Sequence, residues 1–180
     1  MFFVKENALS EKDIEYLLTE DFNYSKAGIY NLSSDNGKGH LTKHRRVRQS
    51  LLDKENNKEI FEQIIRLFNE ANSVLFKENY DEFLTRIYLM KYDSTDLGHF
   101  NWHIDTIESD ELDTIRKLSM SIILNDKFHG GELIFKDKTF KNVKPGTCII
   151  FPSTYEHKVD PVLEGTRFSL VAWTYKDKTA

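Results

Sequence analysis

The sequence predicts an α+β fold in which helices come first and β-strands follow. Before residue 80, apolar side chains recur with the 3.6-residue period of amphipathic helices. After residue 83, short segments rich in β-branched and aromatic residues alternate with turn-forming residues. Such segregation is typical of α+β domains, in which the helices brace one sheet. The length of 180 residues favours a single domain, residues 1–180, in which residues 1–80 form a mainly helical support.

Two amphipathic helices are expected in this first part. In "SEKDIEYLLTE", Ser10 is a candidate N-cap, with Asp13 three residues later. The stretch "KEIFEQIIRLFNEANSVLF" carries a stronger apolar stripe, which predicts a long helix packed on a flat surface. The stripe consists of Ile60, Ile64, Leu67, Phe68, Ala71 and Leu75.

Several short strands are expected after residue 83. They are "FLTRIYLMKY", "LSMSIILN", "GELIF", "TCIIF" and "TRFSLVAWTY", divided by the turns "NDKFHGG", "KPG" and "LEG". Strands of this length and spacing indicate a sandwich or barrel.

Composition excludes some functions and leaves others open. The net charge of −4 gives no general attraction to nucleic acid or to anionic membranes. Cys148 is the only cysteine, so an internal disulfide and a thiolate zinc cluster are excluded, and its apolar surroundings predict a buried, inert thiol. No signal peptide or membrane span is evident, which makes a cytoplasmic location the expectation. The sequence does not indicate an oligomeric state.

Two charged segments each allow two interpretations. Lys43, Arg45, Arg46 and Arg48 form a basic cluster, which is either a solvated surface or a rim that receives an acidic substrate. Residues 106–117, "TIESDELDTIRK", are acidic and have no clear strand pattern. They form either a surface excursion or a mobile flap over a site.

A histidine and an aspartate stand two residues apart in "GHFNWHIDTI". On an extended strand, His103 and Asp105 would share one face, while Trp102 and Ile104 would face the other way. Alone, this pattern more often marks a hydrogen-bonded surface pair than a metal site. A third ligand would reverse that preference, and the candidates are His40, His44, His99, His129 and His157. His157 follows an apolar strand, where a side chain can face a barrel mouth.

An arginine lies on a strand that is apolar on both faces. In "TRFSLVAWTY", Arg167, Ser169, Val171 and Trp173 share one face. A buried guanidinium is costly unless it meets an anion, which is either a protein carboxylate or a ligand carboxylate held by a bidentate fork. Two histidines and one carboxylate can form the facial triad of non-haem Fe(II) sites.

With these residues in view, the chain resembles the 2-oxoglutarate- and Fe(II)-dependent dioxygenases, in their prolyl 4-hydroxylase-like branch and close to the PKHD-type hydroxylases. The matching segments are "WHID", "LSMSIILNDKFHGGELIF" and "VKPGTCIIFPSTYEHKVDPVLEGTRFSLVAWTY". The resemblance covers residues 83–175, with "VRQS" and "NEAN" as looser matches upstream. It implies a double-stranded β-helix, or jelly roll, with the N-terminal helices packed on its major sheet.

The resemblance also implies roles for individual residues. His103, Asp105 and His157 would bind iron, and Arg167 would bind the far carboxylate of 2-oxoglutarate. Ser169 would be a second contact to that carboxylate, and Tyr92 would donate a hydrogen bond to the cosubstrate. A tyrosine of some relatives is replaced here by Ile123, which cannot donate. Trp173 is expected to pack in the core. Phe100 and Trp102 either line the pocket or fill the core, and core packing is preferred for Trp102.

The implied activity is hydroxylation of an unactivated C–H, with prolyl residues of a peptide or protein as the leading substrate. It would use Fe(II), 2-oxoglutarate and O2, convert 2-oxoglutarate to succinate and CO2, and take ascorbate as a candidate reductant. Asp105 favours hydroxylation, because halogenating relatives lack this carboxylate. The alternatives are a hydroxylase of a free amino acid or other small molecule, a non-catalytic metal-binding jelly-roll module or sensor, and a cupin-like zinc or structural site.

Overall fold

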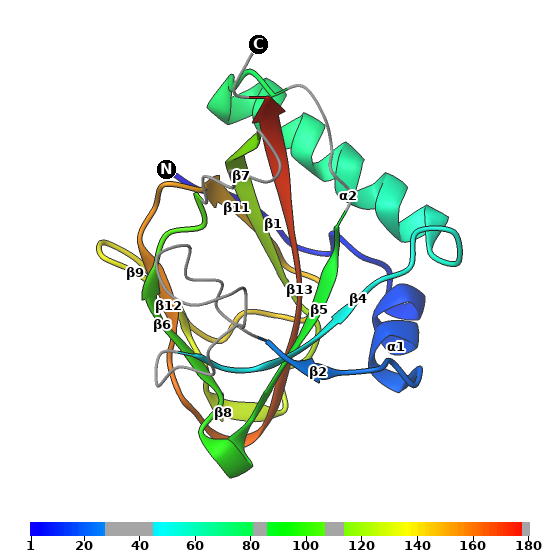
Figure 1. Ribbon diagram of the computed structural model, residues 1–180, viewed down its shortest axis with the longest axis vertical. Helices are drawn as coiled ribbons and strands as arrows, with labels where there is room; N and C mark the ends of the chain where they lie inside the picture. Colours follow the sequence, from blue (N-terminus) through cyan, green and yellow to red (C-terminus); the bar gives the residue numbers. More distant parts are fainter. Residues whose placement is uncertain (28–44, 81–85, 107–113, 178–180) are drawn as a thin grey trace, which may run out of the picture.

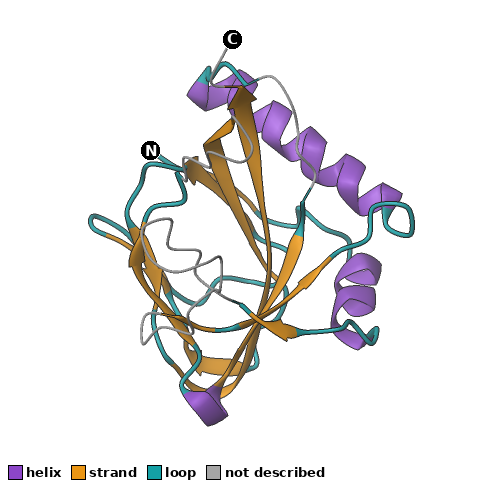
Figure 2. Cartoon of the chain, viewed as in Figure 1, coloured by secondary structure: helices purple, strands orange, loops and turns teal. Residues whose placement is uncertain are grey.

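Two antiparallel β-sheets dominate the computed structural model, which describes residues 1–27, 45–80, 86–106 and 114–177 (Figures 1 and 2). The eight-stranded sheet has the order β1 (Phe3–Lys5), β11 (Cys148–Pro152), β7 (Thr114–Ile123), β13 (Val162–Asp177), β5 (Tyr88–Asp93), β4 (Arg48–Leu51) and β2 (Ser25–Lys26), and β8 (Phe128–Gly130) pairs with β13. The five-stranded sheet has the order β10 (Thr139–Phe140), β9 (Leu133–Phe135), β12 (His157–Val159), β6 (His99–His103) and β3 (Arg45–Arg46).

The helices are α1 (Glu11–Thr19) and α2 (Lys58–Ala71), with a π-helical turn, η1 (Asn72–Phe76), after α2 and a 3₁₀ turn, η2 (Ser94–Asp96), after β5. Ser10 caps α1 as predicted, because its Oγ accepts a hydrogen bond of 3.1 Å from the backbone N–H of Asp13. In Figure 1, both helices lie on one side of β7, β13 and β5, and the five-stranded sheet lies on the other.

One hydrophobic cluster joins α2 to the eight-stranded sheet. All but one member of the predicted stripe are buried; the exception is Leu75, which is half-buried in η1. The same cluster takes in side chains from β5, β7, β11 and β13. These sheet residues are Leu89, Leu118, Met120, Ile122, Cys148, Ile150, Leu170 and Ala172. The Cys148 thiol is fully buried as predicted, and burial raises its pKa well above the usual range.

A second hydrophobic cluster includes side chains from both sheets. Met90 and Tyr92 come from β5, Ile149 and Phe151 from β11, and Leu133, Phe135 and Val159 from the five-stranded sheet. On β13, Leu170 and Ala172 belong to the cluster with the helices, whereas Arg167 and Ser169 line a cavity in the interior. The alternation predicted for this strand is confirmed, and it directs one face of β13 away from the helices.

All five predicted strand segments contain strands. Two predicted turns are wrong in whole or in part, because "NDKFHGG" contains β8 and "LEG" lies inside β13. There Gly165 has φ +73°, and a Cβ on it would stand 2.5 Å from the Lys127 carbonyl oxygen. The register of β13 against β8 shifts between Val162 and Glu164, so the chain bulges instead of turning. The short strands β1 to β4, with two to four residues each, were not anticipated because they are too short to show a period.

The charged segments are placed only in part. Arg46 is exposed, and its Nη1 donates to the carbonyl oxygen of Asp96 (3.1 Å), which fits the solvated-surface interpretation. Arg45 differs, because its side chain reaches into the interior. Lys43 and residues 107–113 lie outside the described residues, so the acidic flap stays a prediction, and β7 already begins at Thr114. Among the described helices, none is both long and apolar enough to cross a membrane.

Candidate metal centre and the adjoining cavity

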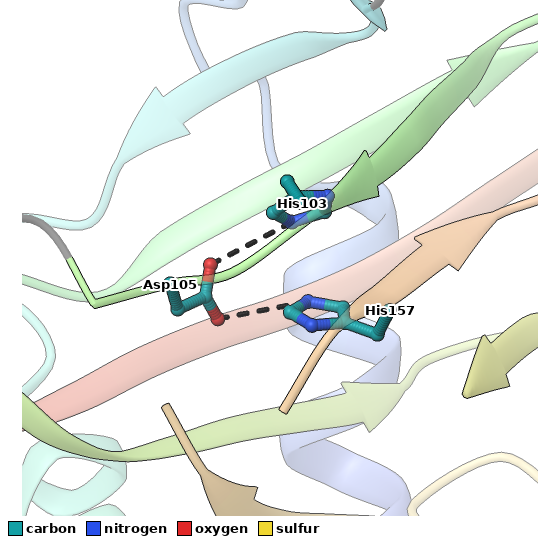
Figure 3. A group of neighbouring side chains, drawn as sticks. All are labelled: His103, Asp105 and His157. Carbon is teal, nitrogen blue, oxygen red and sulfur yellow. Dashed lines mark ion pairs between the residues drawn. The ribbon is translucent and has the colours of Figure 1, made fainter. Parts of the chain in front are cut away.

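Three side chains with metal-ligating atoms meet between the two sheets (Figure 3). Nε2 of His103 lies 3.6 Å from Oδ1 of Asp105, and Nε2 of His157 lies 3.7 Å from Oδ2 of the same carboxylate. The three ligand atoms all lie within 4.8 Å of one another. Of the five histidines considered as a third ligand, the structure brings His157 to the pair. His99 and His129 are not part of the cluster, and His40 and His44 lie outside the described residues.

Strand pairing explains why the two histidines meet. His103 on β6 is the direct cross-strand partner of His157 on β12, and their ring centroids are 4.2 Å apart. The next registered pair is Phe100 with Val159, so two residues of β6 oppose one of β12. This β-bulge turns both Phe100 and His103 inward, where their rings stack at 3.5 Å. Trp102 is 44% exposed, so the expectation that it packs in the core is wrong.

Both imidazoles are held in a state that suits metal binding. Nδ1 of His103 donates to the carbonyl oxygen of Asn101 (2.7 Å), and Nδ1 of His157 donates to that of Tyr155 (2.9 Å). A neutral imidazole that donates through Nδ1 carries its lone pair on Nε2. Two nitrogen lone pairs and a carboxylate therefore face one another at distances too long for a hydrogen bond. Such a group of acceptors is unfavourable by itself and fits a divalent cation.

The third ligand residue is held through its backbone. The N–H groups of Asp105 and Thr106 both donate to the carbonyl oxygen of Ser153 (2.9 and 3.0 Å), and Ser153 Oγ hydrogen-bonds Ser119 Oγ at 2.9 Å. Arg116 Nη1 donates to the carbonyl oxygen of Asp105 at 3.4 Å. Burial acts to raise the pKa of the Asp105 carboxyl, but electrostatic interaction with His157, His103 and Arg116 outweighs burial, and the pKa is lowered. Asp105 is thus an anion in the absence of metal.

The pKa of His103 predicts a pH-dependent stability of the metal-free chain. Burial, and next the neighbouring His157, lower this pKa from 6.5 to about 4. Between these pH values the unfolded chain binds a proton at this position that the folded chain does not, so the free energy of unfolding should fall as the pH falls from 6.5 to 4. The loss attributable to His103 is up to about 3 kcal/mol. Urea unfolding with a chelator, compared between wild type and His103→Gln, measures it; equal pH slopes would contradict the expectation.

The buried arginine lies in the same interior. Arg167 is 1% exposed, and its Nη1 donates to Ser169 Oγ at 2.8 Å. Its guanidinium carbon lies 5.1 Å from the ring centre of Tyr92, which is also buried. Among the residues that the structure describes, no carboxylate forms an ion pair with Arg167, and its Nε–H has no partner. Burial lowers the pKa of Arg167. Of the two predicted anions, the protein carboxylate is therefore not found within the described ranges.

One cavity connects the triad to this arginine. Its wall includes the three ligand residues together with Arg167, Ser169 and Tyr92, so the structure brings together all six predicted site residues. Ile123 does not belong to the wall of this cavity. It is the cross-strand partner of Ser169.

Three further residues of this wall are Arg45, Phe100 and Trp173. Arg45 lies 4.4 Å from the ring centre of Phe100, whose ring also stacks on His103. Phe100, expected either to line the pocket or to fill the core, lines this cavity. Trp173 lines the cavity and is half-buried, so the expectation that it packs in the core is wrong, and its position on the same strand face as Arg167 and Ser169 was the available signal. The inward position of Arg45 could not be predicted, because β3 has only two residues, and the bulge in β6 breaks the alternation at Phe100.

Trp173 predicts a measurable effect on the metal site. Its ring lies 3.9 Å from the guanidinium carbon of Arg116, and its indole N–H lowers the pKa of Asp105, although Nε1 has no hydrogen bond of ordinary geometry. Trp173→Phe keeps an aromatic ring at this position and removes the N–H together with the second ring of the indole. We expect Co(II) to bind about tenfold more weakly. Removal of a group that orients a metal ligand typically lowers metal affinity by about 10- to 100-fold, and this expectation is the lower end of that range. Competition with a chromophoric chelator measures this; unchanged affinity would assign Trp173 to packing alone.

The fold and the site together define a class of protein: two antiparallel sheets that enclose a two-histidine, one-carboxylate centre and a buried arginine. A family model described as the 2OG-Fe(II) oxygenase superfamily matches residues 87–175, which include all three candidate ligands and Arg167. This match confirms the predicted resemblance to the 2-oxoglutarate- and Fe(II)-dependent oxygenases.

Curated relatives match over part of their length. A PKHD-type hydroxylase of Delftia acidovorans is 35% identical over 88 residues, which are 43% of this chain and 38% of that protein. A PKHD-type hydroxylase of Prochlorococcus marinus is 45% identical over 62 residues, which are 31% of this chain and 28% of that protein. The matched part of this chain thus spans well under half the length of these relatives.

Solved structures match over nearly the whole chain. A viral collagen prolyl hydroxylase from Paramecium bursaria Chlorella virus-1, in its 2OG complex, has a TM-score of 0.70 with 20% identity and covers 97% of this chain and 96% of its own. A Pseudomonas putida prolyl-4-hydroxylase has a TM-score of 0.71 with 16% identity, covering 97% and 92%. A Trichoplax adhaerens prolyl hydroxylase, in complex with a hypoxia inducible factor peptide fragment, has a TM-score of 0.71 with 18% identity, covering 99% and 84%. At these identities the likeness is one of fold.

Proposed function

We propose that this chain is a single-domain 2-oxoglutarate- and Fe(II)-dependent dioxygenase with a double-stranded β-helix core, and that it hydroxylates an unactivated C–H. The observation that carries the proposal is the pairing of two centres in one cavity. His103, Asp105 and His157 face one another as acceptors, and Arg167 is a buried cation without a carboxylate partner among the described residues. A 2-oxo dicarboxylate suits both centres, since one end chelates a metal and the other pairs with a guanidinium.

In this proposal each residue has a defined task. His103 and His157 present their Nε2 lone pairs to the metal, and Asp105 adds the anionic ligand. Arg167 binds the far carboxylate, with Ser169 and Tyr92 as further contacts. When bound, Fe(II) with 2-oxoglutarate and O2 supplies the oxidising power for C–H hydroxylation, with release of succinate and CO2. The chain itself supplies orientation and a cavity walled by Phe151, Val171 and other apolar side chains.

Prolyl residues of a peptide or protein are the proposed substrate. The support is the likeness to prolyl hydroxylases, one of them in complex with a peptide, and the relation to PKHD-type hydroxylases. Ascorbate as a reductant and the cytoplasm as location belong to the same proposal. A free amino acid or another small molecule is the alternative substrate, and a non-catalytic metal-binding module is the alternative function.

The test is aerobic turnover with a defined product. Purified protein is loaded with Fe(II), 2-oxoglutarate and ascorbate, and offered a library of proline-containing peptides together with free amino acids. Succinate and a mass gain of one oxygen atom on a substrate are expected with wild type and not with Asp105→Ala. If wild type forms no more succinate than Asp105→Ala across the whole panel, the dioxygenase assignment is wrong. A mass gain on an amino acid alone would shift the substrate class.

A further inference from the structure

A second cavity adjoins the first across Arg167. It has a volume of about 320 Å³ and is walled by residues 128–133, by Ile123 and Ile149, and by residues of the segment before β11. Leu133 and Arg167 belong to the walls of both cavities. We call this second space the rear cavity.

The strand register places the rear cavity beyond Arg167 as seen from the metal ligands. Along β13, Trp173, which lies beside Asp105, is followed toward the start of the strand by Ser169 and then by Arg167. On the neighbouring β7, Ser119 pairs with Trp173 and Ile123 pairs with Ser169. Ile123 and Arg167 therefore lie at the ends of these strands that point away from the metal ligands. Arg167 stands as a partition, with the triad on one side and the rear cavity on the other.

The stem of this partition packs closely against Gly131, while its guanidinium has few fixed contacts. Gly131, on the wall of the rear cavity, has φ +69°, and a Cβ on it would lie 3.0 Å from Cδ of Arg167 and 2.9 Å from Cγ2 of Val162. Only a glycine leaves the arginine stem room at this point. On the side of the triad, the fixed contacts of the guanidinium are one hydrogen bond to Ser169 and the ring of Tyr92. No carboxylate among the described residues holds the guanidinium at one depth.

A cosubstrate pocket that ends at a fixed wall discriminates between ligands of different length. One extra methylene in such a closed pocket changes binding by about 10- to 200-fold. Here the wall is a single side chain that borders both cavities. No ion pair within the described part of the chain fixes its guanidinium, so we expect a longer diacid to displace the guanidinium toward the rear cavity.

We propose that the rear cavity lets this chain bind 2-oxo dicarboxylic acids longer than 2-oxoglutarate, 2-oxoadipate first among them. The inference rests on the proposed function, because it assumes that a 2-oxo acid chelates the metal while its far carboxylate meets Arg167. Ile123 is the residue that sets the limit, since it is 4% exposed, lies beside Ser169 and forms part of the rear wall.

Binding can be measured without turnover. The Fe(II)-loaded protein is titrated without O2, once with 2-oxoglutarate and once with 2-oxoadipate, and the visible charge-transfer band of the chelate is followed. We expect the dissociation constant of 2-oxoadipate to lie within about tenfold of that of 2-oxoglutarate, below the discrimination of a closed pocket. A larger ratio overturns the inference and leaves the proposed function standing. If neither acid gives a band, the proposed function fails and the inference fails with it.

Two substitutions of one residue test whether the rear cavity is responsible. Ile123→Phe fills the rear wall and is expected to raise the ratio of the two dissociation constants by at least about tenfold, whatever its effect on 2-oxoglutarate alone. Ile123→Val removes one methyl group from the same wall and should leave the ratio unchanged or lower it. If Ile123→Phe weakens both acids equally, Ile123 is only a packing residue and the inference is wrong. The wild-type titration decides the question by itself should Ile123→Phe not fold.

Discussion

Replacement of Arg167 by methionine should make the metal-free chain more stable and nearly abolish its binding of 2-oxoglutarate. The guanidinium is 1% exposed and has no carboxylate partner among the described residues. Replacing a buried charge by an apolar side chain of similar length is often neutral or stabilising, and we expect a gain of about 1–3 kcal/mol in the free energy of unfolding. Loss of the hydrogen bond to Ser169 offsets about 1 kcal/mol of the electrostatic gain and is included in that range.

The same substitution removes the proposed anchor of the cosubstrate. A charge-assisted, bidentate contact to a carboxylate is worth roughly 3 kcal/mol or more in a buried site, which corresponds to a loss of about 100-fold in affinity. Urea unfolding of the metal-free protein and anaerobic titration of the Fe(II) protein with 2-oxoglutarate give the two quantities. A gain in stability together with a loss of binding separates a binding role from a packing role, because removal of a purely structural arginine would lower stability and leave 2-oxoglutarate binding intact.

A surface arginine provides the matched control. Arg66 on α2 is 66% exposed and forms a long contact of 3.6 Å with Glu62. Arg66→Met should change the free energy of unfolding by no more than about 0.5 kcal/mol and leave 2-oxoglutarate binding unchanged. If Arg167→Met instead destabilises the chain and leaves binding intact, the guanidinium has a structural partner and the cosubstrate assignment is wrong.

Local patterns in the sequence predicted those features that depend on neighbours along the chain. The cap of α1 by Ser10 and the buried stripe of α2 follow from contacts within one helix. The shared face of Arg167 and Ser169 follows from the period of a single strand. The residues of the triad could be chosen because the resemblance supplied the long-range link between "WHID" and His157, which spacing alone left open among five histidines.

Features that depend on strand register could not be predicted. The bulge in β6 follows from the pairing of Phe100 with Val159 and of His103 with His157, and it turns Phe100 to the same side as His103, which the alternation of a regular strand would not do. The rear cavity depends on how β8 and β9 pass behind Arg167, which the glycines of "KFHGG" suggested only as a turn. Register is a property of two strands together, so no single segment carries it.

Metal binding should stabilise the folded chain strongly, and Asp105 should be required for it. In the metal-free chain two imidazole lone pairs and a carboxylate converge, and a divalent cation converts these unfavourable contacts into bonds. An ion present at 100 times its dissociation constant adds about 2.7 kcal/mol to the free energy of unfolding. Asp105→Ala should weaken Co(II) binding by more than about 100-fold, because the loss of groups that merely orient a ligand already costs up to that much. The added stability should then disappear.

Thermal unfolding with and without Co(II) measures this difference, and Asp160→Ala is the matched control. Asp160 is a nearby aspartate that pairs with Lys158 at 2.6 Å and takes no part in the cluster of ligand atoms. Its removal should leave the metal-dependent rise in Tm intact, whereas Asp105→Ala should abolish it. A zinc or other structural site would show the same dependence on Asp105. The rival functions are separated instead by the charge-transfer band on addition of Fe(II) and 2-oxoglutarate, which such a site would lack. If Asp105→Ala retains the full rise in Tm, the ion binds elsewhere, and the three converging side chains are not the metal centre.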